Sequence, residues 1–224
     1  MCAPANPRQQ PTGSNSEAIT VSFQVVVKWC KMRVGILLFD EAEELDFVGP
    51  LEVFGIASRL VQSLSVVTVS KDGQPIRGRY GLRVQPDYRF TDCPALDLLI
   101  VPGGKGAREH ARYDNAIISF VKTHASKQEI ASICTGALVL AEAGILAGRR
   151  ATTHHSALDM LRRYADVNVI EGARFVVDNG VATSAGISAG IDLALELVRR
   201  DFGEKVALEV AQTMEYSYQS AQPT

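Results

Sequence analysis

The segment Ile130-Ala131-Ser132-Ile133-Cys134-Thr135-Gly136-Ala137-Leu138 decides the predicted fold. An apolar run typical of a buried strand leads into a short bend, and a helix that opens with a small residue follows. This order is typical of a nucleophile elbow, in which a sharp turn between strand and helix presents a reactive side chain. The segment therefore predicts an α/β protein with Cys134 at the turn.

The same succession of strand and helix extends along the chain. Two continuous apolar runs, 33–39 (RVGILLF) and 96–101 (LDLLIV), are typical of strands buried on both faces. Weaker strand signals occur at 65–69 and 130–133. They alternate with helical stretches at 47–61, 116–125 and 136–147. Repeated strand and helix predict a mostly parallel sheet sandwiched by helices.

The C-terminal third predicts a hairpin and two helices. Residues 175–177 and 181–183 flank Asp178-Asn179-Gly180, and a glycine-containing turn between two β-rich runs indicates a β-hairpin. We expect this hairpin to extend an edge of the sheet. Apolar residues at helical spacing predict helices over 188–202 and 204–216.

Composition limits the class of protein. A chain of 224 residues, 46% hydrophobic and 21% charged, predicts one globular domain. A formal net charge of −2 provides no general attraction for phosphates, so nucleic acid is not expected as a partner. The apolar run 21–27 is far shorter than the roughly 20 residues of a membrane span, so no membrane contact is expected. Residues 1–20 lack the features of a signal peptide, which predicts a cytoplasmic location.

The predicted domain occupies residues 32–217. Met32 immediately precedes the first strand, so residues 1–31 are expected to be a disordered or variable leader. Residues 218–224 form a polar tail. No internal repeat or linker divides the rest.

Cys134 is the candidate nucleophile. The four cysteines are widely spaced, without a CxxC pair or histidines at zinc-finger spacing, so no metal site is expected. A helix N-terminus stabilises a thiolate, so a cysteine at this bend is expected to be activated. The alternative is a small buried hydrophobic residue, but the position before Thr135-Gly136 favours the reactive thiol. Thr135 stands where a Cys-His dyad would have histidine, which disfavours peptide hydrolysis.

Three further segments follow predicted strands and are candidates for the same site. The N–H groups of Gly103 and Gly104 can approach a bound oxygen, although these glycines also suit a simple turn. Asp46 is either the N-cap of the first helix or, beside Cys134, a general acid or base with a raised pKa. His154 follows a short strand and either lines the same crevice or lies on the surface.

Four motifs in this order resemble the ThiJ/PfpI superfamily of class I glutamine amidotransferase-like proteins. They are GILLF with ELDFVGPLEVF, DLLIVPGG, SICTGALVLAEAGILAGRRATTHH and TSAGISAGIDLALELV. The similarity extends from about Met32 to Tyr216 and is strongest to the isonitrile hydratase branch. It implies a flavodoxin-like, doubly wound and usually dimeric protein whose site lies at the carboxyl ends of the strands.

The resemblance also assigns roles to residues. A nucleophilic cysteine in a CTG turn and its partner aspartate match Cys134 and Asp46, and Thr135 matches the threonine beside the nucleophile. Ile187 matches a backbone contact in a loop that is richer in glycine in the family. The implied reaction converts a small-molecule isonitrile into an N-substituted formamide through a Cys134 thioimidate. Neither a metal nor an organic cofactor is implied, and a cytoplasmic homodimer is expected.

Two other functions stay open. Glyoxalase- or amidase-type members of the superfamily usually carry glutamate and a histidine elbow, whereas this sequence has Asp46 and Thr135. The domain also resembles the sensor half of AraC-type regulators. After Phe202, however, the sequence has neither a helix-turn-helix pair nor a basic stripe. A ligand or redox sensor without catalytic activity is therefore the second alternative.

Overall fold

A seven-stranded sheet forms the centre of the protein. The computed structural model describes residues 31–218, so the predicted leader and tail lie outside the described residues except for Lys31 and Tyr218. The strand order is β10-β11-β7-β6-β1-β2-β5. The strands are β1 (Met32–Leu38), β2 (Leu64–Ser70), β5 (Tyr88–Arg89), β6 (Leu98–Val101), β7 (Glu129–Ser132), β10 (Phe175–Asp178) and β11 (Val181–Ser184). All neighbours pair in parallel except β10 and β11. The predicted parallel sheet with an edge hairpin is confirmed.

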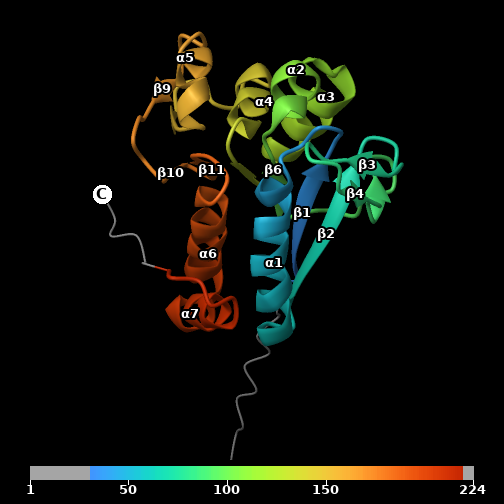
Figure 1. Cartoon of the computed structure of the whole chain (residues 1–224), viewed down its shortest axis with the longest axis vertical. Helices are drawn as coiled ribbons and strands as arrows, with labels where there is room; N and C mark the ends of the chain where they lie inside the picture. Colours follow the sequence, from blue (N-terminus) through green and yellow to red (C-terminus); the bar gives the residue numbers. More distant parts are fainter. Residues whose placement is uncertain (1–30, 219–224) are drawn as a thin grey trace, which may run out of the picture.

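Two groups of helices flank this sheet. One group comprises α1 (Glu44–Leu60), α6 (Ala189–Phe202) and α7 (Glu204–Thr213), which contact one another. The other comprises α2 (Lys105–Glu109), α3 (Asn115–Ala125) and α4 (Gly136–Glu142), together with the short helices η1 (Ala111–Tyr113), η2 (His155–Ala157) and α5 (Leu158–Leu161). Figure 1 shows α1 and α6 side by side, with α7 at their lower ends.

Three helix boundaries differ from the predicted ones by three or more residues. α1 begins at Glu44 rather than Phe47, and α7 ends at Thr213 rather than Tyr216. α4 ends at Glu142 instead of reaching Ala147, because Gly144 adopts a left-handed φ of +74° just after the C-cap, where glycine commonly ends helices.

Two short strand pairs lie outside the main sheet, and of their four strands the sequence predicted only the short one before His154. An antiparallel pair joins β3 (Ile76–Arg77) to β4 (Arg83–Val84), and a parallel pair joins β8 (Arg150–Ala151) to β9 (Asn168–Val169). Each strand has only two residues, so it carries no periodic pattern in the sequence.

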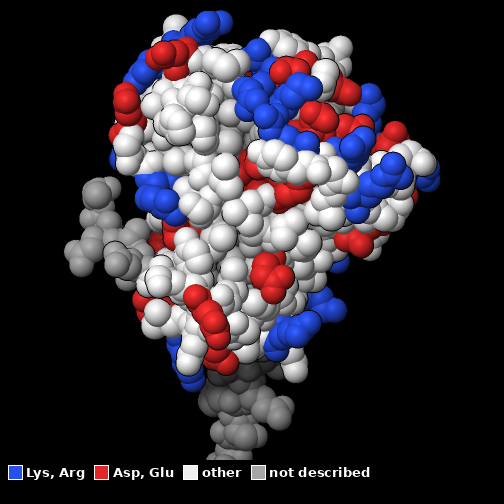
Figure 2. All heavy atoms as spheres, in the orientation of Figure 1, with Lys and Arg blue, Asp and Glu red and all other residues white. Residues whose placement is uncertain are grey.

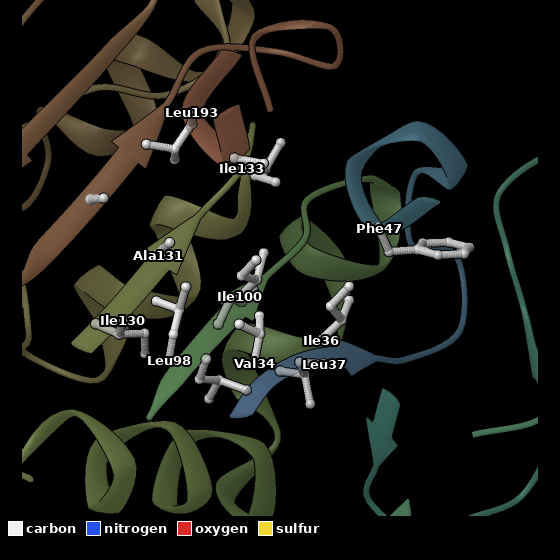
Figure 3. Packing of buried hydrophobic residues seen from close by; sticks show 14 of the residues in the cluster. Val34, Ile36, Leu37, Phe47, Leu98, Ile100, Ile130, Ala131, Ile133 and Leu193 are labelled. Atoms are coloured by element: carbon white, nitrogen blue, oxygen red, sulfur yellow. The ribbon is translucent and has the colours of Figure 1, made fainter. Parts of the chain in front are cut away.

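The core is built from the apolar runs that predicted the strands. Figure 3 shows Ile36 of β1, Ile100 of β6 and Ile130 of β7 along the sheet, with Phe47 from α1 and Leu193 from α6 packed nearby. Each of these side chains is at most 1% exposed. Burial on both faces explains why the strands lack alternation of apolar and polar residues.

The chain reverses its winding direction between β1 and β6. From β1 it passes through α1 to β2 on one side and then crosses to β6, β7 and β11 on the other side. In doubly wound sheets, ligands bind outside the carboxyl ends of the strands at such a reversal. The fold therefore directs attention to the segments that follow β1, β6 and β7.

The surface carries both signs of charge. Figure 2 shows basic and acidic side chains mixed at the upper right and along the edges of the visible face, around a largely uncharged area. Between residues 31 and 218, none of the helices combines the length and the apolar character that crossing a membrane requires.

Substitutions of Ile100 test the contribution of the central strands. Ile100→Val should lower the free energy of unfolding by about 0.5–1.5 kcal/mol and Ile100→Ala by about 2–5 kcal/mol, because each leaves a larger cavity. Urea denaturation measures both. Leu208→Ala, at a position that is 49% exposed on α7, is the control and should change stability by less than about 0.5 kcal/mol. Equal losses at both positions would contradict this description of the core.

Candidate functional site

Segments that follow three neighbouring strands meet at Gly103. Asp46 lies in the first turn of α1 after β1, Gly103 follows β6, and Cys134 with Thr135 follows β7. A Cβ atom added at Gly103 would lie 2.5 Å from the Thr135 nitrogen and 2.9 Å from Asp46 Oδ2. Real Cβ atoms do not approach so closely, so the three segments can meet only because this residue is glycine.

The backbone of Cys134 is left-handed, with φ of +55°. Its N–H donates to the Ala185 carbonyl at 2.9 Å, and its carbonyl accepts from Thr153 Oγ1 at 2.8 Å. A left-handed non-glycine residue costs of the order of 1–3 kcal/mol and persists only where its surroundings enforce it. These two hydrogen bonds hold the predicted elbow in its sharp turn.

Ile187 is a second left-handed residue at the site, with φ of +52°. A β-branched residue rarely adopts this conformation. Its loop joins β11 to α6 and brings the Ile187 N–H toward the sulfur of Cys134, where it lowers the pKa of the thiol. Strained residues of this kind cluster at functional sites.

Asp46 is a fully buried carboxyl group. Its Oδ2 accepts from the Gly103 N–H at 3.0 Å, whereas no hydrogen bond of normal geometry reaches Oδ1 from the residues that the structure describes. Burial, together with the charge of Glu43, raises the pKa of Asp46 to about 7 against the opposing effects of Gly103, Cys134 and Ile187. A group with this pKa can exchange protons readily at neutral pH.

Asp46 is not the N-cap of α1, which was one interpretation of the sequence. Glu43 occupies that position, without a hydrogen bond from its side chain. The helix begins earlier than predicted, and Asp46 therefore points from its first turn toward Gly103.

The Cys134 thiol is not activated at rest. Burial, followed by the charge of Asp46, raises the pKa of Cys134 to about 12, although the N–H and hydroxyl of Thr135 and the N–H of Ile187 lower it. The expectation of a stabilised thiolate was wrong, because desolvation outweighs the donors at the bend. The thiol therefore needs a base, and Asp46 lies beside it.

The N–H groups of the two glycines after β6 donate hydrogen bonds to side chains of the protein itself. The N–H of Gly103 donates to Asp46, and the N–H of Gly104 donates to Thr135 Oγ1 at 2.9 Å. The same hydroxyl donates back to the Gly104 carbonyl at 3.1 Å. Neither glycine N–H is the free oxyanion donor that the sequence suggested. The N–H groups of Thr135 and Ile187, which face the sulfur, are the better candidates for that role.

His154 lies at the rim of the site. A Cβ at Gly186 would be 2.0 Å from the His154 ring, so the ring packs on the loop directly before Ile187. Its Nδ1 is 2.8 Å from Ser156 Oγ. Burial, then the nearby His155 and Arg108, lowers its pKa. Within residues 31–218 no hydrogen bond joins His154 to Cys134 or Asp46, and the ring packs against the Gly186 loop instead.

Two supporting residues were missed by the sequence analysis. Thr153 and Ala185 fix the carbonyl and N–H of Cys134, respectively. Thr153 stands beside His154 in the TTHH motif, so its hydroxyl was a detectable signal. Ala185 contributes only backbone, for which a side-chain pattern offers no signal.

The described residues contain no group of three or more His, Cys, Asp or Glu side chains placed to hold a metal ion. The polar groups that act on the Cys134 thiol are the Asp46 carboxyl, the Thr135 hydroxyl and the N–H groups of Thr135 and Ile187.

Comparison with known proteins agrees with this geometry. The sequence model of the DJ-1/PfpI family matches residues 32–200. The chain belongs to this family. The ThiJ/PfpI resemblance in the sequence and the flavodoxin-like fold that it implied are thereby confirmed.

Individual relatives include enzymes and regulators. An isonitrile hydratase of Pseudomonas putida is 37% identical over 187 residues, which are 83% of this chain and 79% of that protein. The HTH-type transcriptional regulator CdhR of Pseudomonas aeruginosa is 32% identical over 179 residues, which are 79% of this chain but 52% of the regulator. The crystal structure of a THiJ/PfpI family protein from Pseudomonas syringae superposes with a TM-score of 0.76 at 28% identity, covering 97% of this chain and 84% of that one.

Gly103→Ala tests the meeting point of the three segments. The added methyl group must displace Thr135 or Asp46, so we expect a loss of about 1–3 kcal/mol in the free energy of unfolding. Gly55→Ala in α1 is the matched control, because no atom lies within 4 Å of its added Cβ. It should raise stability by about 0.5–1 kcal/mol. Thermal and urea denaturation measure both, and a neutral Gly103→Ala would show that the segments are further apart.

The raised pKa of Asp46 predicts a pH-dependent stability. With a folded pKa of about 7 and an unfolded value near 3.8, the native state holds this proton more tightly between those values. The free energy of unfolding should therefore fall as pH rises from about 4 to 7, by about 4 kcal/mol from this group, and Asp46 should add no slope above about pH 8.

Asp46→Asn isolates this contribution. Its stability relative to wild type should increase with pH over the same interval, measured by urea denaturation at a series of pH values. Asp166→Asn, at an exposed position, is the control and should follow wild type. A constant difference between Asp46→Asn and wild type would refute the raised pKa.

Proposed function

We propose that the protein is a cysteine-dependent lyase that hydrates an isonitrile to an N-substituted formamide. The observation that carries the proposal is the buried Asp46 carboxyl, with a pKa of about 7, beside the Cys134 thiol. The similarity to an isonitrile hydratase over most of both chains supports it.

The first step of the proposed reaction joins Cys134 to the substrate. The sulfur lone pair forms a bond to the terminal carbon of R–N≡C, while Asp46 accepts the thiol proton and delivers it to the same carbon. The product is a thioimidate, R–N=CH–S–Cys134. Because this carbon both accepts the nucleophile and receives the proton, a single group beside the thiol can serve both transfers.

The second step releases the formamide. Asp46 accepts a proton from water as the water oxygen adds to the thioimidate carbon, and it passes this proton to the nitrogen, which gives R–NH–CH(OH)–S–Cys134. The C–S bond then breaks as the C=O bond forms, the hydroxyl proton passes through Asp46 to the sulfur, and R–NH–CHO leaves. Overall, one isonitrile and one water give one formamide. The N–H groups of Thr135 and Ile187 face the position where charge changes and would stabilise it.

The site favours this reaction over the glyoxalase or amidase type. The acid held beside Cys134 is Asp46, whereas Glu43 forms an ion pair with Arg79 and Glu44 Oε1 accepts the Tyr80 N–H. The elbow residue is Thr135, whose hydroxyl is bonded to Gly104. Carbonyl substrates would need a proton donor at the oxygen, and no histidine hydrogen-bonds to the thiol within the described part of the chain.

A ligand or redox sensor is the second candidate function. The similarity to CdhR, which this chain matches over about half of the regulator's length, favours it. The burial of Cys134 and the raised pKa of its thiol argue against a redox sensor, because rapid oxidation requires an exposed thiolate.

The cytoplasmic location and the homodimer expected from the sequence belong to this proposal. Three exposed apolar side chains, Leu45, Tyr80 and Ile187, occur in segments around the site and would suit contact with a second copy. Light scattering coupled to size-exclusion chromatography measures the molar mass and so tests whether the protein is a homodimer.

Formamide production from an alkyl isonitrile tests the function. Cys134→Ala should abolish turnover because no covalent intermediate can form, and Asp46→Asn should lower kcat by about 10²–10⁴-fold because it removes the proton carrier. Gas or liquid chromatography measures the formamide. Cys93→Ala is the matched control at a half-buried cysteine remote in sequence from the elbow, and it should retain wild-type turnover. An inactive wild type, or a Cys134→Ala protein with full activity, would overturn the proposal.

The pH profile of kcat/KM tests the role of Asp46 as the base. The rate should rise with pH to a half-maximum near the pKa of about 7, because only the carboxylate can accept the thiol proton. Glu43→Gln should move this half-maximum to lower pH, since the charge of Glu43 raises the pKa of Asp46. If the half-maximum of kcat/KM lay at the same pH in Glu43→Gln and in wild type, the base would be a group other than Asp46.

A further inference from the structure

A groove lies at the amino ends of the strands, on the edge of the sheet opposite to Cys134. It has a volume of about 710 Å³. Its floor is apolar and comes from the end of α1 and from the junction of α6 and α7, with Leu60, Val61, Phe202 and Val206. Its rim is polar, with Lys31, Gln62, Ser63 and Asp201. We call these eight residues the basal groove.

The floor of the basal groove leaves apolar side chains open to solvent. Leu60 is 40% exposed, and Val61, Phe202 and Val206 are partly exposed. Figure 1 shows the lower end of α1 next to α7. A contiguous exposed apolar area rimmed by polar residues is typical of a surface that another segment or molecule covers.

The sequence directly before Lys31 has the matching chemistry. In Val21-Ser22-Phe23-Gln24-Val25-Val26-Val27-Lys28-Trp29, every second residue from Val21 to Trp29 is a large apolar one. The residues between them are polar, apart from Val26. In an extended chain, alternate side chains point to the same side, so this segment would present one continuous apolar face.

We propose that residues 21–29 dock in the basal groove of the same chain, with the alternate apolar side chains on its floor. The segment then has a structural role, covering the junction between α1, α6 and α7.

The covalent connection to Lys31 favours residues 21–29 as the segment that occupies the basal groove. Lys31 itself lines the groove, and the Met32 N–H donates to the Ser63 carbonyl at 2.8 Å, so the chain enters β1 beside the groove. Residues 21–29 end two positions before Lys31 and can extend roughly 30 Å at about 3.3 Å per residue. A segment attached at the rim reaches the floor without the entropic cost of bringing two molecules together.

Charge is compatible with the same arrangement. Asp201 lies on the rim, and Lys28 stands on the polar side of the segment, away from the apolar face. Asp201 already pairs with Arg200, so an additional ion pair between Asp201 and Lys28 would contribute little to the free energy of docking.

Trp29 makes the proposal measurable, because it is the only tryptophan of the chain. In the full-length protein its fluorescence emission should lie at shorter wavelength than in the denatured chain, and acrylamide should quench it less. Leu60→Glu places a charge on the floor of the groove and should increase quenching by about twofold or more, with emission shifted to longer wavelength. Leu208→Glu, at an exposed leucine of α7 outside the groove, is the control and should leave the fluorescence of Trp29 unchanged.

A second pair of variants alters only the segment. Phe23→Asp, on the apolar face, should expose Trp29, whereas Gln24→Asp on the opposite face should not. Far-UV circular dichroism of all variants establishes that the domain stays folded. Trp29 emission equal to that of the denatured chain, or unaffected by both Leu60→Glu and Phe23→Asp, would overturn the proposal. A shift that appears only at high protein concentration would do so as well, because the groove would then hold the segment of a second copy.

Discussion

The close approach of three chain segments at Gly103 is the constraint on which the rest of the site depends. The N–H of this residue holds Asp46, and the absence of a side chain lets Thr135 pack against it. A parallel sheet brings the ends of β1, β6 and β7 to one edge but leaves the segments beyond them a strand spacing or more apart. The absence of a side chain at the central position closes that gap, so the buried carboxyl and the buried thiol can lie next to each other.

Burial then controls the chemistry of this pair. Desolvation is the largest cause of both raised pKa values, and it leaves the proton on the sulfur with a neighbouring carboxyl that titrates near neutrality. The left-handed backbones of Cys134 and Ile187 lie at this pair, and the N–H groups of Thr135 and Ile187 lower the pKa of the thiol. The close-packed core below, from Ile36 to Ile130, supplies the stability that keeps these residues in unfavourable conformations.

The two edges of the sheet are used differently. The carboxyl edge carries the polar, strained segments, whereas the amino edge carries the apolar basal groove. The fold is shared with an isonitrile hydratase and with half of a transcriptional regulator, so the fold alone does not select the function.

The sequence by itself determined the elements and their order. The continuous apolar runs, the turn Asp178-Asn179-Gly180 and the strand-bend-helix pattern around Cys134 involve residues close in the chain, and local periodicity encodes such elements. It also supplied the candidate residues, through the motifs shared with the family. Tertiary structure alone decided what these residues do. Gly103 bonds to a residue 57 positions away and Gly104 to one 31 positions away, so the roles of both glycines became apparent only on folding. The protonation of Asp46 and Cys134 likewise depends on how completely distant segments exclude water, which is a property of packing that no local pattern carries.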